Sequence, residues 1–364
     1  MMQQTALVLS GGGGRGAYHI GAYRALVECG WCADGRGPDI LVGTSIGAIN
    51  GAAIASGRTV AELHALWRAM HTEDVQVLSG EVPALLRPIV RRIFRDVLTS
   101  ESGDDATTPT GNTFWGGGLF SQLFPPFLHV LDTTPWRRTL NEPQVTECGP
   151  LRWVDWERIN SATAPALIIT ATDVASGLLR TFSNRATPRR SAEPINIDHL
   201  MASSSIPLIY SWTPVNGKYY WDGAVLANTP LQPVIDLTGD AEVDTVVVMM
   251  SPWHATHGLA EEELPQNLFQ ALARTLDWAL AASYQTALEM LEERNHFAQA
   301  VAQLVAAGLP WDGPRPRPFR RPLIIAPEQL MPPDWIIDYE PATHELLFAQ
   351  GYQDAQRALA GRVA

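Results

Sequence analysis

The feature that most constrains the fold of this chain is a run of glycines between an apolar segment and a helical pattern, LVLSGGGGRGAYHIGAYRAL at residues 7–26. Residues 5–9 predict a short buried strand, and residues 17–28 carry apolar side chains at helical spacing. The same order follows again, because DILV at residues 39–42 predicts a second strand and the small-residue segment after it predicts a helix. Two successive strand–turn–helix units indicate a parallel sheet covered by helices.

Further strands and helices extend this plan toward the C-terminus. Short β-prone runs predict strands at residues 166–170, 218–221 and 244–250. Residues 266–307 contain neither Gly nor Pro and predict one long helix, or two helices broken near Asn295. We therefore expect an α/β fold with a mostly parallel central sheet sandwiched between helices in three layers, and a C-terminal helical extension.

The composition excludes several function classes. The 364 residues are 46% hydrophobic, enough for a sizeable core, and the formal net charge of -12 disfavours binding to nucleic acid. The three cysteines cannot form a disulfide framework, and the C-x-x-C pair Cys29 and Cys32 lacks the second pair that a zinc site needs. Because no cluster of His, Asp or Glu has ligand spacing, we expect neither a metal nor another cofactor.

Gly11, Gly13 and Gly16 fit G-x-G-x-x-G, the fingerprint of dinucleotide sites. Such a site also needs an acidic residue at the end of the second strand to bind a ribose, but Asp39 lies at the wrong end of that strand. The sequence G-K-[ST] is missing as well, which excludes a P-loop. Nucleotide binding is therefore weakly supported, although the amides of this loop and the helix after it suit an anion.

The second predicted strand ends in Gly43-Thr44-Ser45-Ile46-Gly47, which matches G-x-S-x-G. In a nucleophile elbow the serine sits on a sharp strand-to-helix turn, and glycines flank it because a side chain there would collide with the strand or the helix. The N-terminus of the following helix favours developing negative charge. Ser45 is therefore a candidate nucleophile.

The glycine loop and Ser45 are expected side by side, because loops after neighbouring parallel strands lie at the same edge of a sheet. The backbone N–H groups of residues 11–16 can then bind the oxyanion of a tetrahedral acyl intermediate. Losing one such donor typically slows catalysis by about a hundred- to a thousandfold. Arg15 either adds a cation beside this site or forms a surface salt bridge that braces the loop.

A serine nucleophile needs a base. His254 and His257 follow a predicted strand and are candidates for the histidine of a Ser-His-Asp esterase, whereas His296 and His344 fall in helical patterns that we expect at the surface. Asp222 is the competing base, because it ends the β-prone run KYYW. Taken by itself, an Asp-Gly pair is more typical of an ordinary turn.

Three motifs in this order, GGGGRG, GTSIG and DGAVLANTP, resemble those of the patatin-like phospholipases. The stretches LDTTPWRRTL at residues 131–140, ATDVASG at residues 171–177 and ASSSIP at residues 202–207 support the likeness, which extends from about residue 5 to about residue 250. The third motif departs from many family members in having Ala224 where they have glycine.

The resemblance implies a Ser–Asp dyad without a histidine, in which Asp222 contacts Ser45 directly as its base. A carboxylate has a pKa of about 3.9 in water and is a weak base there, but it becomes a better one in a dry site, hydrogen-bonded to a serine hydroxyl. The resemblance also implies an oxyanion hole made of the amides around Gly12, Gly13, Gly14 and Arg15. The other motif glycines are Gly11, Gly16, Gly43, Gly47 and Gly223.

The expected domain organisation follows from the extent of the likeness. We expect residues 1–255 to form the acyl hydrolase domain, and residues 256–364 to form a helical extension packed on it. Within the extension, residues 314–322 form a Pro/Arg-rich linker. The segment LIIAP after this linker can add one strand to the sheet, and Pro341 can open a helix to about Ala360.

The implied substrates are lipid acyl esters, of phospholipase A, lysophospholipase or esterase type. Apolar residues at 119–128 can line an acyl channel or contact a bilayer, and can equally pack in the core. The basic segment 87–95 can lie on anionic lipid or form a solvated helix face. The alternative to an enzyme is a catalytically idle protein on the same fold that binds lipid or has a regulatory role. Neither acyl chain length nor oligomeric state follows from the sequence.

The start of the sequence lacks the charged segment and the apolar run of a signal peptide. Its apolar runs are also shorter than the roughly eighteen residues that predict a transmembrane helix. We therefore expect a cytoplasmic protein, with a possible peripheral contact at a membrane surface.

Overall fold

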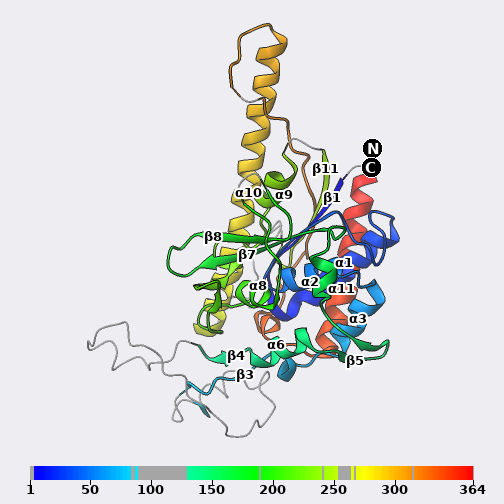
Figure 1. Cartoon of the computed structure of the whole chain (residues 1–364), viewed down its shortest axis with the longest axis vertical. Coiled ribbons are helices and arrows are strands. Elements are labelled where there is room, and N and C mark those ends of the chain that lie inside the picture. Colours follow the sequence, from blue (N-terminus) through cyan, green and yellow to red (C-terminus); the bar gives the residue numbers. More distant parts are fainter. Residues whose placement is uncertain are drawn as a thin grey trace, which may run out of the picture.

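The computed structural model of the chain describes residues 4–82, 87–88, 129–187, 190–239, 242–252, 264–265, 268–313 and 315–363. Within these residues, eight strands form the central sheet in the order β12-β11-β1-β2-β7-β10-β9, with β8 paired to β7 outside this path (Figure 1). In the same order they are β12 (Leu323–Ile325), β11 (Val243–Val248), β1 (Gln4–Leu9), β2 (Ile40–Thr44), β7 (Ala166–Asp173), β10 (Lys218–Asp222), β9 (Thr213–Val215) and β8 (Leu179–Ser183).

The centre of the sheet is parallel. β12, β11, β1, β2 and β7 run in one direction, whereas β8 and β10 are antiparallel to β7, and β9 is antiparallel to β10. Every residue of β2 and β7 is buried, because helices cover both faces of the sheet. The expected α/β fold with a mostly parallel sheet is confirmed.

Most of the helices surround this sheet, and two small hairpins lie outside it. The described helices are α1 (Ala17–Glu28), α2 (Ile46–Ala55), α3 (Val60–Arg68), α6 (Thr134–Asn141), α7 (Trp156–Ile159), α8 (Ile197–Ser203), α9 (Gln232–Thr238), α10 (Leu268–Ala306) and α11 (Pro341–Val363). The hairpins are β3 (Val77–Leu78) with β4 (Leu131–Asp132), and β5 (Gln144–Thr146) with β6 (Gly149–Leu151).

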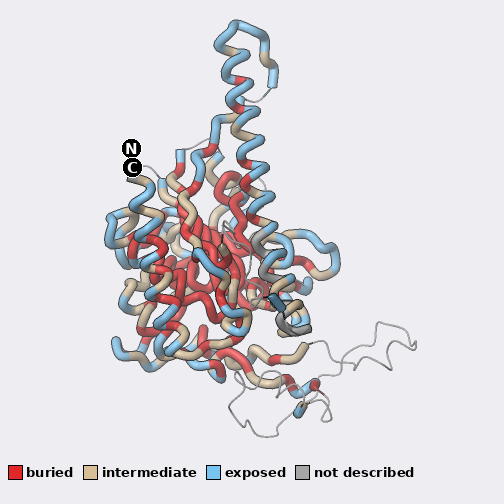
Figure 2. Tube along the Cα trace, turned by 180° about the vertical axis from the view of Figure 1, so that it is seen from behind, coloured by how far each residue is buried: buried red, intermediate tan, exposed pale blue. Residues whose placement is uncertain are grey.

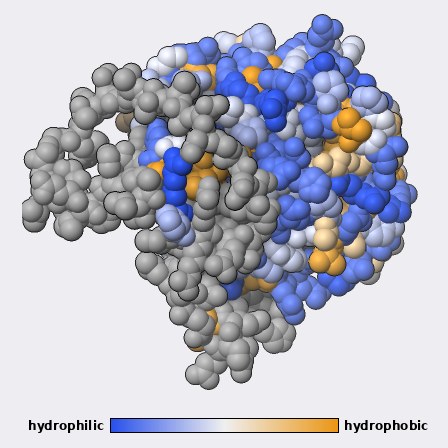
Figure 3. Space-filling model, turned by 90° about the horizontal axis from the view of Figure 1, so that it is seen from below, coloured by the Kyte–Doolittle hydropathy of each residue, from blue (hydrophilic) through white to orange (hydrophobic). Residues whose placement is uncertain are grey.

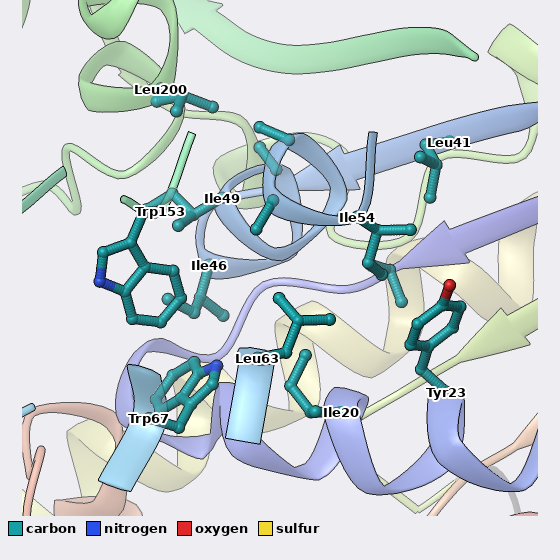
Figure 4. Close-up of a cluster of buried hydrophobic side chains, with 14 of the residues drawn as sticks. Ile20, Tyr23, Leu41, Ile46, Ile49, Ile54, Leu63, Trp67, Trp153 and Leu200 are labelled. Carbon is teal, nitrogen blue, oxygen red and sulfur yellow. The ribbon is translucent and has the colours of Figure 1, made fainter. Parts of the chain in front are cut away.

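Two apolar cores lie on opposite faces of the sheet, and their buried residues concentrate at the centre of the molecule (Figure 2). Since successive residues of a strand point to opposite faces, β1 contributes to both cores. Leu7 and Leu9 pack with α1, α2, α3 and α11, whereas Ala6 and Val8 pack with α9 and α10. Figure 4 shows part of the first core, in which α2 lies among side chains from α1, α3 and β2.

The C-terminal region contributes to both the sheet and a helical layer. β12 pairs in parallel with β11, and α11 packs along α1. The two helix backbones approach closely, because a Cβ on Gly21 would lie 1.9 Å from the Phe348 carbonyl oxygen, and one on Gly351 would lie 2.1 Å from the Tyr18 carbonyl oxygen. Glycine at these two positions therefore permits the close packing of α11.

α10 is one continuous helix of 39 residues, so the alternative of two helices broken near Asn295 is wrong. The Asn295 side chain donates to the Phe319 carbonyl oxygen at 2.8 Å and accepts from the Phe319 N–H at 2.7 Å, which ties the returning chain to the helix. Residues 315–322 of the predicted linker contain neither helix nor strand. The second half of α10 projects beyond the sheet (Figure 1).

Among the described residues, no helix combines the length and the apolar character needed to cross a membrane. The described part of the surface in Figure 3 is mainly hydrophilic, with apolar side chains in separate spots. The apolar segment 119–128 lies outside the described residues, and so does all of the basic segment 87–95 except its first two residues. The roles expected for these two segments stay predictions.

Candidate active site

Ser45 occupies the sharp turn between β2 and α2. Its backbone has φ 56° and ψ -127°, a conformation that L-residues rarely adopt and that costs about 1–3 kcal/mol. The neighbouring glycines permit the turn: a Cβ on Gly43 would lie 2.4 Å from the Gly47 carbonyl carbon, and one on Gly47 would lie 2.3 Å from the Leu9 carbonyl oxygen. Residues 43–47 thus have the strand–turn–helix arrangement of a nucleophile elbow.

The Ser45 backbone is held on both sides, and the residue is only 3% exposed. Its N–H donates to Ser203 Oγ at 2.8 Å, and its carbonyl oxygen accepts from the N–H groups of Ala48 and Ile49 at 2.9 and 3.3 Å. Ser45 is the N-cap of α2, so its hydroxyl lies at the positive end of that helix. This position favours negative charge on or near the serine oxygen.

Ser45 and Asp222 come together because β2 and β10 approach the same edge of β7 from opposite directions. β8 pairs with residues 168–172 of β7, which include partners of both β2 and β10, and therefore occupies the other edge. β2 is parallel to β7 and ends with Thr44 opposite Thr170, while β10 is antiparallel and ends with Asp222 opposite Ala171. The last residues of β2 and β10 are therefore neighbours along β7.

The Asp222 carboxyl is buried, and its position is fixed by hydrogen bonds. Its Oδ1 accepts from the Ala224 N–H at 2.8 Å, while its carbonyl oxygen accepts from the Thr172 hydroxyl at 2.9 Å and its N–H donates to the Ser205 carbonyl oxygen at 2.8 Å. Burial raises the pKa of Asp222 to about 7, and interactions with the Ser45 hydroxyl and the Ala224 N–H act in the opposite direction. A pKa near neutrality suits a general base.

The glycine loop lies directly beside Ser45. A Cβ on Gly11 would lie 3.1 Å from the Ser45 Cβ, and Gly13 lines the same cavity as Ser45. Asn228 holds the loop in place, because its Oδ1 accepts from the Gly11 N–H at 2.8 Å. The structure therefore brings the two loops together, as the argument from parallel strands predicts.

Backbone N–H groups at the end of this loop could receive an anion. A short 3-10 turn, η1 (Gly13–Gly16), begins here, and the Arg15 N–H donates to the Gly12 carbonyl oxygen at 3.3 Å. Among the described residues, the N–H groups of Gly12, Gly13 and Gly14 have no hydrogen-bond acceptor. These three donors are available to an oxyanion, whereas the Arg15 N–H is already engaged. Their role in catalysis stays a prediction.

A C-terminal segment packs against the outside of the glycine loop. It comprises residues 331–340, and we call it the C-terminal strap. A Cβ on Gly13 would lie 1.9 Å from the Ile336 carbonyl oxygen, and one on Gly14 would lie 1.8 Å from the Asp338 carbonyl oxygen. Any side chain on these two glycines would therefore displace the strap.

The Arg15 side chain fastens the loop to the strap. It is buried, and its guanidinium donates to the carbonyl oxygens of Met331 and Pro332 at 3.3 and 3.0 Å. Arg15 therefore braces the glycine loop from a buried position, and the expectation that it lies at the surface is wrong.

Two further motif glycines permit close packing around the site. A Cβ on Gly16 would lie 2.4 Å from Ile46 Cγ1, at the start of α2. A Cβ on Gly223 would lie 2.4 Å from Thr170 Oγ1, next to the junction of β2 and β10. Both glycines thus support the geometry of the turn that holds Ser45 and Asp222.

The cavity beside Ser45 is small and mostly apolar. Its accessible volume is about 10 Å³, room for roughly one water molecule, whereas sites for drug-sized ligands usually measure about 300–1,000 Å³. The wall consists of Gly13, Ser45, Ile46, Ile49, Val75, Trp136, Ser204, Ile206, Tyr210 and Tyr339. In this arrangement the cavity cannot hold a lipid acyl chain.

The histidines give a mixed result. His254 and His257 lie outside the described residues, so the Ser-His-Asp alternative stays untested. His296 is exposed on α10, as expected. The expectation for His344 is wrong: it is buried, its Nδ1 donates to the Trp67 carbonyl oxygen at 2.7 Å, and burial lowers its pKa to about 4.

Within the described part of the chain, no group of three or more His, Cys, Asp or Glu side chains forms a candidate metal site. Cys29 and Cys32 are free thiols at the end of α1. Burial raises the pKa of Cys32 to about 12, which keeps this thiol protonated.

Sequence reasoning missed the buried side chains that position or enclose the site. Ser203 and Asn228 lie within stretches that carry the family resemblance, ASSSIP and DGAVLANTP, and could have been found there. Tyr210 and Tyr339 also line the cavity, but no local pattern marks them. They become visible only when distant parts of the chain are placed side by side.

Comparisons with known proteins point to one family. A family model described as patatin-like phospholipase matches residues 7–235. The patatin-like phospholipase domain-containing protein 7 of Rattus norvegicus is 48% identical over 84 residues, which are 23% of this chain and 6% of that protein. The triacylglycerol lipase ptl3 of Schizosaccharomyces pombe is 43% identical over 186 residues, which are 50% of this chain and 34% of that protein. The chain thus matches at most about a third of the length of these relatives.

Among solved structures, VipD from Legionella pneumophila aligns with 99% of this chain and 67% of its own, at 14% identity and a TM-score of 0.42. The family model covers more than half of the chain and includes the glycine loop, Ser45 and Asp222. The chain belongs to the patatin-like phospholipase family.

Proposed function

We propose that this chain is a serine lipid acyl hydrolase that cleaves carboxylic esters through an acyl-enzyme intermediate, with Ser45 as nucleophile and Asp222 as base. The observation that carries this proposal is the junction of β2 and β10, which brings a buried carboxyl next to a serine on a strained turn. Family membership supports a lipid ester as the substrate, and so do the names of the relatives, a phospholipase-domain protein and a triacylglycerol lipase.

In the acylation half-reaction, Ser45 Oγ attacks the ester carbonyl carbon while Asp222 accepts the hydroxyl proton. The N–H groups of Gly12, Gly13 and Gly14 stabilise the negative charge that develops on the carbonyl oxygen. The intermediate then collapses, and the bond to the alcohol oxygen breaks. The alcohol leaves with the proton from Asp222, and the acyl group remains on Ser45.

In the deacylation half-reaction, a water molecule attacks the acyl carbon and Asp222 accepts its proton. The same amides stabilise the second oxyanion. The bond to Ser45 Oγ breaks, the carboxylic acid leaves, and the proton on Asp222 returns to the serine oxygen. A pKa of about 7 lets Asp222 accept and donate the proton near neutral pH.

Labelling with a fluorophosphonate probe, followed by mapping of the adduct by mass spectrometry, tests this assignment without a guess about the substrate. We expect one adduct on Ser45 and slower labelling in Asp222→Asn. Ser45→Ala is the control for labelling elsewhere. If vesicles are present and the wild-type chain still gains no adduct on Ser45, the proposal is wrong and a lipid-binding role is favoured.

The base is tested separately, because His254 and His257 remain candidates. Replacing both histidines with alanine should leave labelling and ester hydrolysis intact if Asp222 is the base. If the double variant loses activity while Asp222→Asn retains it, the chain is a Ser-His-Asp esterase.

The division into a hydrolase domain of residues 1–255 and an extension of residues 256–364 belongs to the same proposal, and so does a cytoplasmic location with peripheral contact at a membrane. Sedimentation with vesicles of neutral or anionic phospholipid tests the membrane contact. We expect the chain to sediment with lipid. Because the chain is acidic, we expect no binding to nucleic acid.

A further inference from the structure

One wall of the active-site cavity comes from outside the family domain. Tyr339 lies in the C-terminal strap, whereas all other described residues that line the cavity lie within residues 7–235, the part that the family model matches. A substitution at Tyr339 therefore leaves every residue that the family model matches unchanged.

The strap is held over the cavity by hydrogen bonds from the family domain. Gln76 Nε2 donates to the Ile337 carbonyl oxygen at 2.6 Å. Thr72 Oγ1 accepts from the Tyr339 N–H at 3.2 Å and donates to Glu340 Oε1 at 3.0 Å. These contacts hold the backbone at Ile337 and Tyr339 and the side chain of Glu340, so the Tyr339 ring has a defined position in the cavity wall.

The Tyr339 ring completes an aromatic corner of the cavity. It is buried, and its centroid lies 6.3 Å from that of Trp136. Its hydroxyl interacts with that of Tyr210, which in turn donates to Gln76 Oε1. Burial raises the pKa of both tyrosines, so both hydroxyls are protonated at neutral pH. Their neutral rings close the cavity beside Ser45.

We propose that Tyr339 is a specificity-determining residue that limits the length of the acyl chain bound beside Ser45. This inference rests on the proposed function. In this proposal, an acyl group on Ser45 has its oxygen at the glycine loop and its chain in the apolar cavity that Ser45 shares with Ile46, Ile49 and Trp136. The accessible volume of this cavity is about 10 Å³. Each methylene added to the acyl chain would therefore collide with the residues that line it.

The test compares kcat/KM for p-nitrophenyl acetate and p-nitrophenyl octanoate in the full chain. Since one methylene in an apolar pocket changes selectivity about 10- to 200-fold, Tyr339→Ala should raise the octanoate-to-acetate ratio at least about tenfold. Tyr339→Phe keeps the ring and should keep the wild-type ratio. A ratio unchanged in a folded Tyr339→Ala chain would overturn the proposal.

A matched control separates specificity from loss of packing. Tyr284 is also fully buried, but it lies on α10 in the core on the other face of the sheet. Tyr284→Ala should therefore lower the melting temperature without changing the octanoate-to-acetate ratio. If Tyr339→Ala does not fold, Tyr339→Leu takes its place, because it removes part of the ring and keeps an apolar side chain. A ratio that rises equally in Tyr284→Ala would count against Tyr339.

A binding measurement keeps this inference distinct from the proposed function. In a Ser45→Ala background, calorimetry with decanoate should show at least about tenfold tighter binding when Tyr339→Ala is added. If the wild-type chain hydrolyses no ester and Ser45 takes no label, the proposed function fails. The decanoate comparison still tests whether Tyr339 limits the space beside residue 45. Equal decanoate binding in both variants would overturn the role of Tyr339.

Discussion

Ser45 directly follows β2, Asp222 is the last residue of β10, and these two strands meet end to end along one edge of β7. Thr44 pairs with Thr170 and Asp222 pairs with Ala171, so the register of the sheet sets the separation of the serine and the carboxyl. Sites built on strands and helix ends are held more precisely than sites on loops. The pair therefore has a rigid support, and four measurements test what it does.

The first prediction concerns the pH dependence of ester hydrolysis. Because burial raises the pKa of Asp222 to about 7, and only the ionised carboxyl can accept the Ser45 proton, kcat/KM should rise with pH through about 7 and level off above it. The measurement is a pH–rate profile with a soluble ester. A rate that is constant from about pH 5 upward would show that Asp222 is not the group that must ionise.

The second prediction concerns stability. The folded chain keeps the Asp222 proton up to a pKa of about 7, whereas the unfolded chain loses it near the ordinary value of 3.8. Between these values the folded state binds more protons, so the free energy of unfolding contributed by this group falls as the pH rises. Asp222→Asn cannot ionise, and should stabilise the protein more at about pH 8 than at about pH 4.

Urea denaturation at the two pH values measures this difference. Asp198→Asn is the control, because this carboxyl is partly exposed and lies outside the site. An Asp222→Asn effect that is the same at both pH values would contradict a raised pKa for Asp222.

The third prediction concerns the elbow. Gly47→Ala places a Cβ 2.3 Å from the Leu9 carbonyl oxygen, a backbone atom that cannot move aside. We expect a loss of about 3 kcal/mol in the free energy of unfolding, together with loss of Ser45 labelling. Gly51→Ala, in the same helix, is the matched control, because its Cβ would lie an ordinary 3.6 Å from Leu167 Cδ1.

Because alanine favours a helix more than glycine does, Gly51→Ala should leave the free energy of unfolding unchanged or raise it by up to about 1 kcal/mol. Denaturant titration of both variants measures the difference. Equal effects of the two substitutions would mean that the close approach at Gly47 does not constrain the turn.

The fourth prediction concerns Asn228, whose Oδ1 accepts the Gly11 N–H. Asn228→Ala removes the shorter of the two hydrogen bonds of the Gly11 N–H and leaves the one to the residue 228 carbonyl oxygen at 3.3 Å. This loss costs about 0.5–1.5 kcal/mol and loosens the glycine loop beside Ser45. We expect kcat to fall about tenfold or more while KM changes little, since the loop stabilises the transition state rather than the bound ester.

Asn184→Ala is the control, because Asn184 is a buried asparagine that accepts the Leu167 N–H at 2.8 Å away from the site. It should lower stability and leave kcat unchanged. A similar fall in kcat for both variants would assign the effect of Asn228 to stability alone.

Local sequence patterns were enough to predict the two strand–turn–helix units. α1 spans residues 17–28 as predicted, and Ser45 lies between β2 and α2, because strand periodicity and turn glycines act among neighbours in sequence. β11 and β12 were likewise readable as short apolar runs. β8, β9 and the short helices α6 to α9 were not predicted, since their length leaves too little periodicity to detect.

The residues that surround Ser45 could not be predicted from local patterns, because they come together through tertiary contacts. An Asp-Gly pair by itself predicts only a turn. Asp222 lies beside Ser45 because β10 and β2 share one edge of β7, and no local pattern predicts that pairing. The local pattern around His344 predicts a surface position, but in the fold α11 packs this side chain against the Trp67 carbonyl oxygen. Tyr339 enters the cavity because the strap folds back onto the glycine loop. Local chemistry specifies the turn that presents the serine, whereas its surroundings depend on contacts between segments far apart in the chain.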